Sequence, residues 1–134
     1  MKYNYFIFIL LAYLDIMLDS HIYKCKTFSG KLLLMLHHIG GIYVLFGTLL
    51  FKNQALFHLL SCIFIILTWF YFKRCFYSIV NNKICGVDKH TPFTGTFHHI
   101  KTYFNIPSSN DHMFVEFVGY LFLISIYDIY LLTK

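Results

Sequence analysis

Four apolar segments, separated by shorter polar stretches, set the pattern of this chain. They cover about residues 3–18, 32–51, 55–72 and 113–132. An α-helix rises about 1.5 Å per residue and the hydrocarbon core of a bilayer is about 30 Å thick, so about 20 apolar residues cross it. The last three segments have that length, and the first is shorter. We therefore predict an all-α, polytopic membrane protein with about four transmembrane helices, forming a single membrane domain over residues 1–134.

The first segment has a second interpretation, a cleaved signal peptide, because Lys2 precedes its apolar run. Cleavage requires small residues after the apolar run. The residues found there, Leu18-Asp19-Ser20-His21, make a poor cleavage site. We expect the first helix to be retained.

The connections between the segments differ in length. Residues 52–54 join the second and third segments so tightly that these form an antiparallel helical hairpin. The connection over 73–112 is long, and apolar residues recur within it at helical spacing, at Phe93, Phe97, Ile100 and Phe104. Polar residues fall between them, so we predict a short amphipathic helix over about 93–104 that lies in the membrane interface.

Composition supports a membrane protein and excludes an ordinary soluble domain. The chain is 58% hydrophobic and 13% charged, whereas soluble domains have about 25% charged residues. The net charge of +5 does not indicate a nucleic-acid partner, because the basic residues stand singly at the ends of apolar runs. The expected partner is the lipid bilayer, with a homo-oligomer or other membrane proteins left open.

Basic residues also predict an orientation. We define the loop side as the side of residues 19–31 and 73–112, and the terminal side as the side of both termini and residues 52–54. Eight of the 11 basic residues belong to the loop side: Lys24, Lys26, Lys31, Lys73, Arg74, Lys83, Lys89 and Lys101. Because cytoplasmic loops are enriched in Lys and Arg, we expect the loop side in the cytoplasm and the termini in the lumen or exterior.

The expected redox state of the cysteines depends on that orientation. Cys25, Cys75 and Cys85 belong to the loop side, and Cys62 lies within the third segment. If the loop side is cytoplasmic, these cysteines should be free thiols. If the topology is reversed, a Cys75–Cys85 disulfide becomes plausible.

Ionisable residues inside the apolar segments are costly in lipid, so each is a candidate functional residue. Those near the loop side are candidates for catalysis: Asp15, His37, His38 and Glu116. Loop residues able to approach them are Cys85, His90, His98 and His99. Within this set, His38, His98 and His99 are candidate ligands of a Zn or Fe ion, and no other cofactor is predicted.

A structural role explains the same residues and is the interpretation we favour. Adjacent His37 and His38 point about 100° apart on a helix, so they cannot both face one site. No H-x-x-x-H, H-E-x-x-H or C-x-x-C spacing is present. A hydrogen bond between a histidine and a carboxylate ties neighbouring helices together instead. We interpret His58 and Asp128, near the terminal side, as such an inter-helix pair.

Two resemblances rest on the second and third segments. Leu36-His37-His38-Ile39 resembles the double-histidine helix of the TLC (TRAM–LAG1–CLN8) lipid-metabolism proteins. His37-His38-Ile39-Gly40-Gly41, a span ending at Trp69 and the Asn81-Asn82-Lys83-Ile84-Cys85 stretch are similar to small four-span proteins of the DUF2784 type and related proteins of large DNA viruses. The Cys-Pro-Leu-Thr run of DUF2784 is absent, and that resemblance implies no established activity.

The sequence therefore predicts a structural or accessory component of a membrane, in keeping with a virus-encoded protein, rather than an enzyme. The alternative is a small membrane enzyme or metal-binding protein that acts on lipid at the cytosolic interface through His and carboxylate residues. Convergence of Asp15, a histidine and Glu116 around an open cavity would favour the enzyme. A pore is disfavoured, because no broken span or charged ring is present.

Overall fold

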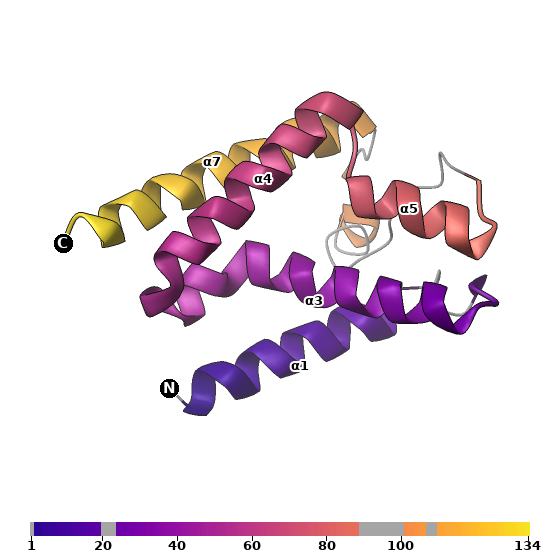
Figure 1. Ribbon diagram of the computed structural model, residues 1–134, viewed down its shortest axis with the longest axis horizontal. Coiled ribbons are helices and arrows are strands. Elements are labelled where there is room, and N and C mark those ends of the chain that lie inside the picture. The colour runs from indigo at the N-terminus through magenta and orange to yellow at the C-terminus, as the bar shows by residue number, and fades with distance from the viewer. Residues whose placement is uncertain (1, 20–23, 89–100, 107–109) are drawn as a thin grey trace.

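The computed structural model describes residues 2–19, 24–88, 101–106 and 110–134, and within these residues it is helical and without strands (Figure 1). The predicted all-α class is confirmed. The helices are α1 (Lys2–Leu18), α3 (Phe28–Leu50), the short 3₁₀ helix η1 (Lys52–Gln54), α4 (Ala55–Phe72), α5 (Phe76–Cys85) and α7 (Asn110–Leu132).

Three of the described helical stretches are long and apolar enough to cross a membrane. They cover Phe28–Leu50, Lys52–Phe72 and Phe114–Leu132, with 23, 21 and 19 residues. The apolar helix over Tyr3–Leu18 is shorter. The helix bounds follow the predicted segments closely, except that α3 begins at Phe28, before Lys31. The Thr27 hydroxyl accepts a hydrogen bond from the Gly30 amide there, which caps the helix start ahead of the apolar run.

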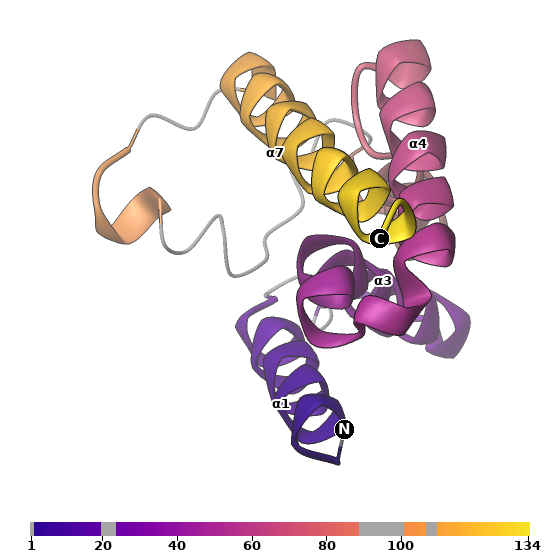
Figure 2. The same cartoon turned by 90° about the vertical axis from the view of Figure 1, so that its left-hand side faces the viewer.

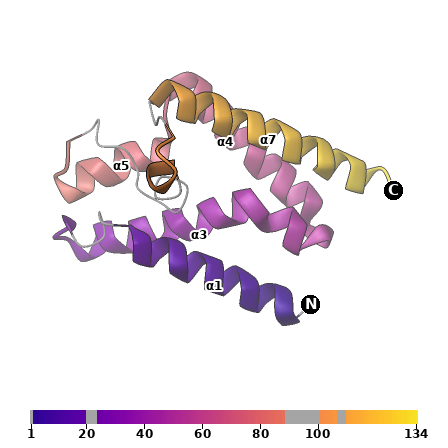
Figure 3. The same cartoon turned by 180° about the vertical axis from the view of Figure 1, so that it is seen from behind.

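The helices form two antiparallel pairs that open like a V. One pair is α1 beside α3, and the other is α4 beside α7, as the 90° view in Figure 2 separates them. The two pairs meet at the η1 turn and diverge toward the other end, where α5 lies along the first half of α3 (Figure 1). Both termini lie at the end of the η1 turn, and the view from behind in Figure 3 agrees.

Apolar side chains between α3, α4 and α7 make the buried core. Its members are Val44, Cys62, Ile66, Trp69, Val118, Leu121 and Ile124. Trp69 packs against Phe117 in a tilted arrangement, with ring centroids 5.0 Å apart. Large apolar side chains also cover the outside of every long helix, such as Tyr3, Leu67 and Leu123. Lipid chains solvate such a surface, whereas a soluble monomer rarely exposes so much of it.

Helix α5 lies in the long connection, where the sequence pattern predicted only an interfacial helix over about 93–104. It was missed because its ten residues include the polar run Asn81-Asn82-Lys83 and are too short for a span. Gly86, with φ of 66°, ends the helix in the left-handed conformation that glycine adopts without strain. Of the predicted interfacial helix, residues 93–100 lie outside the described residues, and Lys101–Tyr103 are helical.

A disulfide joins Cys25 to Cys85, which corrects the expectation for these cysteines. The prediction of free thiols is wrong for both residues, and the alternative Cys75–Cys85 pairing is wrong as well. Helix α5 is the physical reason, because it carries Cys85 to the start of α3 and leaves Cys75 at its opposite end. Cys62 and Cys75 are free.

Candidate functional site

A buried histidine bridges two aspartates at the loop side of α1 and α3. His38 Nδ1 lies 2.6 Å from Asp15 Oδ2, and its Nε2 lies 2.9 Å from Asp19 Oδ2. Carboxylates accept hydrogen bonds, so donation from both ring nitrogens makes His38 an imidazolium. The cluster ties α1 to α3 with two charge-assisted hydrogen bonds in a region where His38 and Asp19 are fully buried.

The sequence interpretation identified Asp15 and His38 and missed Asp19. Asp19 follows the last residue of α1, just beyond the predicted apolar segment. The signal that could have found it is the spacing to Asp15, because residues four apart lie on one face of a helix.

His37 faces away from His38, toward α5. The two histidines therefore do not share one site, as predicted. Its Nε2 lies 3.3 Å from Cys75 Sγ, and its Nδ1 lies 3.3 Å from Asn81 Nδ2. The ring of Tyr77 packs against it in a tilted arrangement, with centroids 5.6 Å apart. Cys75 and Asn81 were not singled out from the sequence, because the helix that carries them was not predicted.

Glu116 does not join the histidines. It is half exposed on α7, and Lys101 donates a hydrogen bond to its Oε2. Asp15, His38 and Glu116 therefore do not converge on one site. His90, His98 and His99, which were candidates to approach the cluster or to bind metal, lie outside the described residues.

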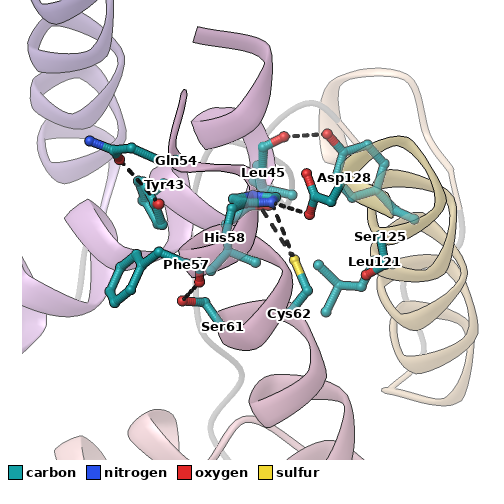
Figure 4. A network of polar contacts seen from close by, with 12 residues as sticks. Tyr43, Leu45, Gln54, Phe57, His58, Ser61, Cys62, Leu121, Ser125 and Asp128 are labelled. Carbon is teal, nitrogen blue, oxygen red and sulfur yellow. Dashed lines mark hydrogen bonds and ion pairs between the residues drawn. The ribbon is translucent and has the colours of Figure 1, made fainter. Parts of the chain in front are cut away.

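The predicted inter-helix pair of His58 and Asp128 is confirmed, and Figure 4 shows it between α4 and α7. His58 Nδ1 lies 2.7 Å from Asp128 Oδ2, and Nε2 lies 3.0 Å from the Val44 carbonyl oxygen. The carbonyl only accepts, so Nε2 carries a proton, and a second proton lies between Nδ1 and Asp128. The pair is thus neutral overall, which reduces the cost of placing it between apolar helices.

His58, Cys62 and Asp128 also form a group whose ligand atoms lie within 4.8 Å of one another (Figure 4). Imidazole, thiolate and carboxylate are ligands that suit Zn. Both His58 nitrogens already have hydrogen-bond partners, so a metal ion would have to displace the bond to Asp128. We therefore interpret the group as a hydrogen-bonded link between α3, α4 and α7.

Close helix approach supports that link. A Cβ atom on Gly47 would lie 2.8 Å from His58 Cδ2, so only glycine lets α3 come this near to α4. Tyr120 of α7 donates a hydrogen bond to the Leu45 carbonyl of α3. Gly40, seven residues earlier on α3, differs, because a Cβ atom there would meet no atom of the described residues within 4 Å.

Cys75 lies outside the long apolar helices, at the N-cap of α5. Burial raises the pKa of its thiol, while the amides of Tyr77 and Ser78 and the Ser78 hydroxyl oppose that shift. A buried thiol with a raised pKa needs a nearby base to become a nucleophile. His37 is a base within reach.

The resemblances to TLC proteins and to four-span proteins of the DUF2784 type stay predictions. Compared with family models, with curated protein sequences and with solved structures, the chain matches none.

Proposed function

We propose that this protein is a structural or accessory component of a membrane, crossing it with α1, α3, α4 and α7. The observation that carries this function is the pairing of polar groups between apolar helices. Asp15 and Asp19 bind His38 and join α1 to α3, and Asp128 binds His58 and joins α7 to α4. The polar groups of these residues bind one another between helices, as a structural role requires.

The described surface near these groups supports the same function. An apolar hollow of about 200 Å³ lies between α1 and α3, and it borders none of the paired polar residues. Its lining is Phe8, Ile9, Ala12, Tyr13, Ile16 and Ile39. Such a hollow suits a lipid chain or an apolar side chain of a neighbouring membrane protein, so the bilayer and laterally associated proteins or copies are the proposed partners.

The alternative, a lipid enzyme acting through His and carboxylate residues, has less support. It needs Asp15, His38 and Glu116 around one cavity, and Glu116 binds Lys101 instead. A Zn or Fe ion at His38 would also have to displace hydrogen bonds to two carboxylates.

The experiment is a double-mutant cycle combined with metal analysis of the purified full chain. For His38→Ala and Asp15→Ala, a structural role predicts a coupling energy in unfolding of about 0.6 kcal/mol, the average for polar pairs between membrane helices, and at most about 1.7 kcal/mol. Tyr13→Ala on the same helix is the matched control and should show no coupling to His38. Stoichiometric Zn or Fe that is lost in His38→Ala would overturn the proposal.

We further propose that the loop side faces an oxidising compartment, which places the termini in the cytoplasm. The Cys25–Cys85 bridge supports this orientation, because disulfides persist in oxidising compartments and are rare in the cytosol. The excess of loop-side Lys favours the opposite orientation. We give more weight to the bridge, since it needs an oxidant to form, while charge asymmetry is a tendency.

Glycosylation decides between the two orientations. The chain has no N-x-Ser/Thr sequon of its own, so one inserted after Val87 can be read without background. In a eukaryotic membrane system it should become glycosylated, and the same insertion after Lys134 should not. If only the C-terminal insertion is glycosylated, the loop side faces the cytoplasm, as the basic residues predict.

A further inference from the structure

Three residues where α3 meets the start of α5 are arranged as in a cysteine hydrolase site. Cys75 Sγ is 3.3 Å from His37 Nε2, and the other ring nitrogen of His37 is 3.3 Å from the Asn81 side chain. A nucleophile, a base and a residue that orients the base define such a site on any fold, by geometry and not by sequence order.

The orientation of the Asn81 amide sets which nitrogen of His37 carries the proton. Asn81 Oδ1 is buried and has no hydrogen-bond partner among the described residues, while Nδ2 faces His37 Nδ1. Turning the amide by a half-turn exchanges its two atoms, and Oδ1 then accepts a hydrogen bond from Nδ1–H. With its proton on Nδ1, His37 presents the lone pair of Nε2 to the Cys75 thiol.

Local structure holds the three side chains in place. Cys75 occupies the N-cap position of α5, where backbone amides favour a thiolate, and the amides of Tyr77 and Ser78 lower the pKa of its thiol. Asn81 lies on the same helix, and the Tyr77 ring packs against His37 in a tilted arrangement. The bridge from Cys85 to Cys25 fastens the end of α5 to the start of α3, the helix that carries His37.

The surroundings indicate the substrate. Cys75 lies three residues beyond Phe72, the last residue of the apolar helix α4. Exposed aromatic side chains surround this junction, as they do at membrane interfaces: Tyr71, Phe72, Phe76 and Tyr77. Lys73 and Arg74 add positive charge next to the thiol. Ester carbonyls of phospholipids lie at this depth, below an anionic headgroup.

We propose that Cys75, His37 and Asn81 form a site that hydrolyses acyl esters of phospholipids. This activity goes beyond the structural role and uses residues other than the inter-helix pairs. Cys75 and His37 are the catalytic residues, and Asn81 is a positioning residue.

The reaction balances with water as the only co-reactant. His37 Nε2 takes the thiol proton while Cys75 Sγ attacks the ester carbonyl carbon, forming a carbon–sulfur bond. The carbon–oxygen bond to the glycerol then breaks, and the proton passes from His37 to the leaving oxygen, which releases a lysophospholipid. His37 next takes a proton from water, whose oxygen attacks the thioester, and the fatty acid leaves as the thiol regains its proton.

The test uses the full chain with its disulfide intact in vesicles of phosphatidylcholine and phosphatidylglycerol. Mass spectrometry follows release of lysophospholipid and fatty acid, and peptide mapping locates any acyl group on the protein. The wild type should release both products in equal amounts and carry the acyl group on Cys75. His37→Gln should lower the rate by about 100-fold or more.

Matched variants separate catalysis from folding. Cys75→Ser should reduce release to background, whereas Cys62→Ser, at the other free thiol, should leave it unchanged. Asn81→Ala should lower kcat with KM preserved, and Asn81→Asp should recover part of the loss because its carboxylate also accepts from Nδ1–H. Three outcomes would each overturn the proposal: absence of products with the unmutated protein, an acyl group on Cys62, or full activity in Cys75→Ser. The first two are measured on the unmutated protein, so they do not depend on whether a variant folds.

Discussion

Replacing Gly47 with alanine tests whether close approach of α3 and α4 stabilises the bundle. The added methyl group would lie 2.8 Å from His58 Cδ2 and 3.0 Å from the Tyr43 ring. The imidazole cannot swing aside, because Asp128 and the Val44 carbonyl hold its two nitrogens. Overpacking of this kind costs about 1–3 kcal/mol.

Gly40 provides the control, since the same substitution there meets no neighbour within 4 Å among the described residues. Both glycines belong to α3, so the gain in helix propensity on replacing glycine by alanine, about 1 kcal/mol, cancels between the variants. The difference in unfolding free energy between Gly47→Ala and Gly40→Ala therefore measures the clash. We expect Gly47→Ala to be less stable by about 1–3 kcal/mol.

The chain has a single tryptophan, Trp69, which packs against α7 and reports separation of α4 from α7. Unfolding of the protein in detergent micelles by sodium dodecyl sulfate, followed by Trp69 fluorescence, gives the two free energies. Equal stability of Gly47→Ala and Gly40→Ala would refute the close approach at His58.

Three further outcomes are expected. Gly30→Ala should lower the fraction of protein with an intact Cys25–Cys85 disulfide, because a Cβ atom there would lie 2.8 Å from Cys85 Sγ. Gel mobility without reductant measures that fraction. A disulfide formed in all of the variant protein would contradict the close packing at Gly30. Asp128→Ala should destabilise the fold by about 1 kcal/mol or more, since His58 Nδ1 then loses its carboxylate partner and keeps only the weak contact with Cys62 Sγ at 3.8 Å. Unchanged detergent resistance would count against the pair. Burial raises the pKa of Cys75, so less thiolate is present at neutral pH than for an ordinary thiol. Iodoacetamide should therefore label Cys75 slowly, and the labelling rate should still increase above about pH 8.5. A labelling rate that levels off below that pH would contradict the raised pKa.

Some of the polar contacts could be predicted from the sequence because depth in a bilayer follows from counting residues. His58 and Asp128 lie equally far from the terminal side, so their contact was expected and is observed. Asp15 and His38 share the loop side and also meet. Glu116 has a similar depth, yet it binds Lys101, because depth leaves the direction of a side chain around its helix axis undetermined.

Apolar runs of span length have few stable states in lipid other than a helix, so the helical class and the bounds of the long helices could be predicted from residue pattern alone. The faces on which those helices meet could not. Helix α5 has only ten residues and no apolar run of span length, so the Cys25–Cys85 bridge and the approach of Cys75 and Asn81 to His37 were not predicted. Those contacts depend on how α5 folds back along α3, which is a property of packing between segments far apart in the chain.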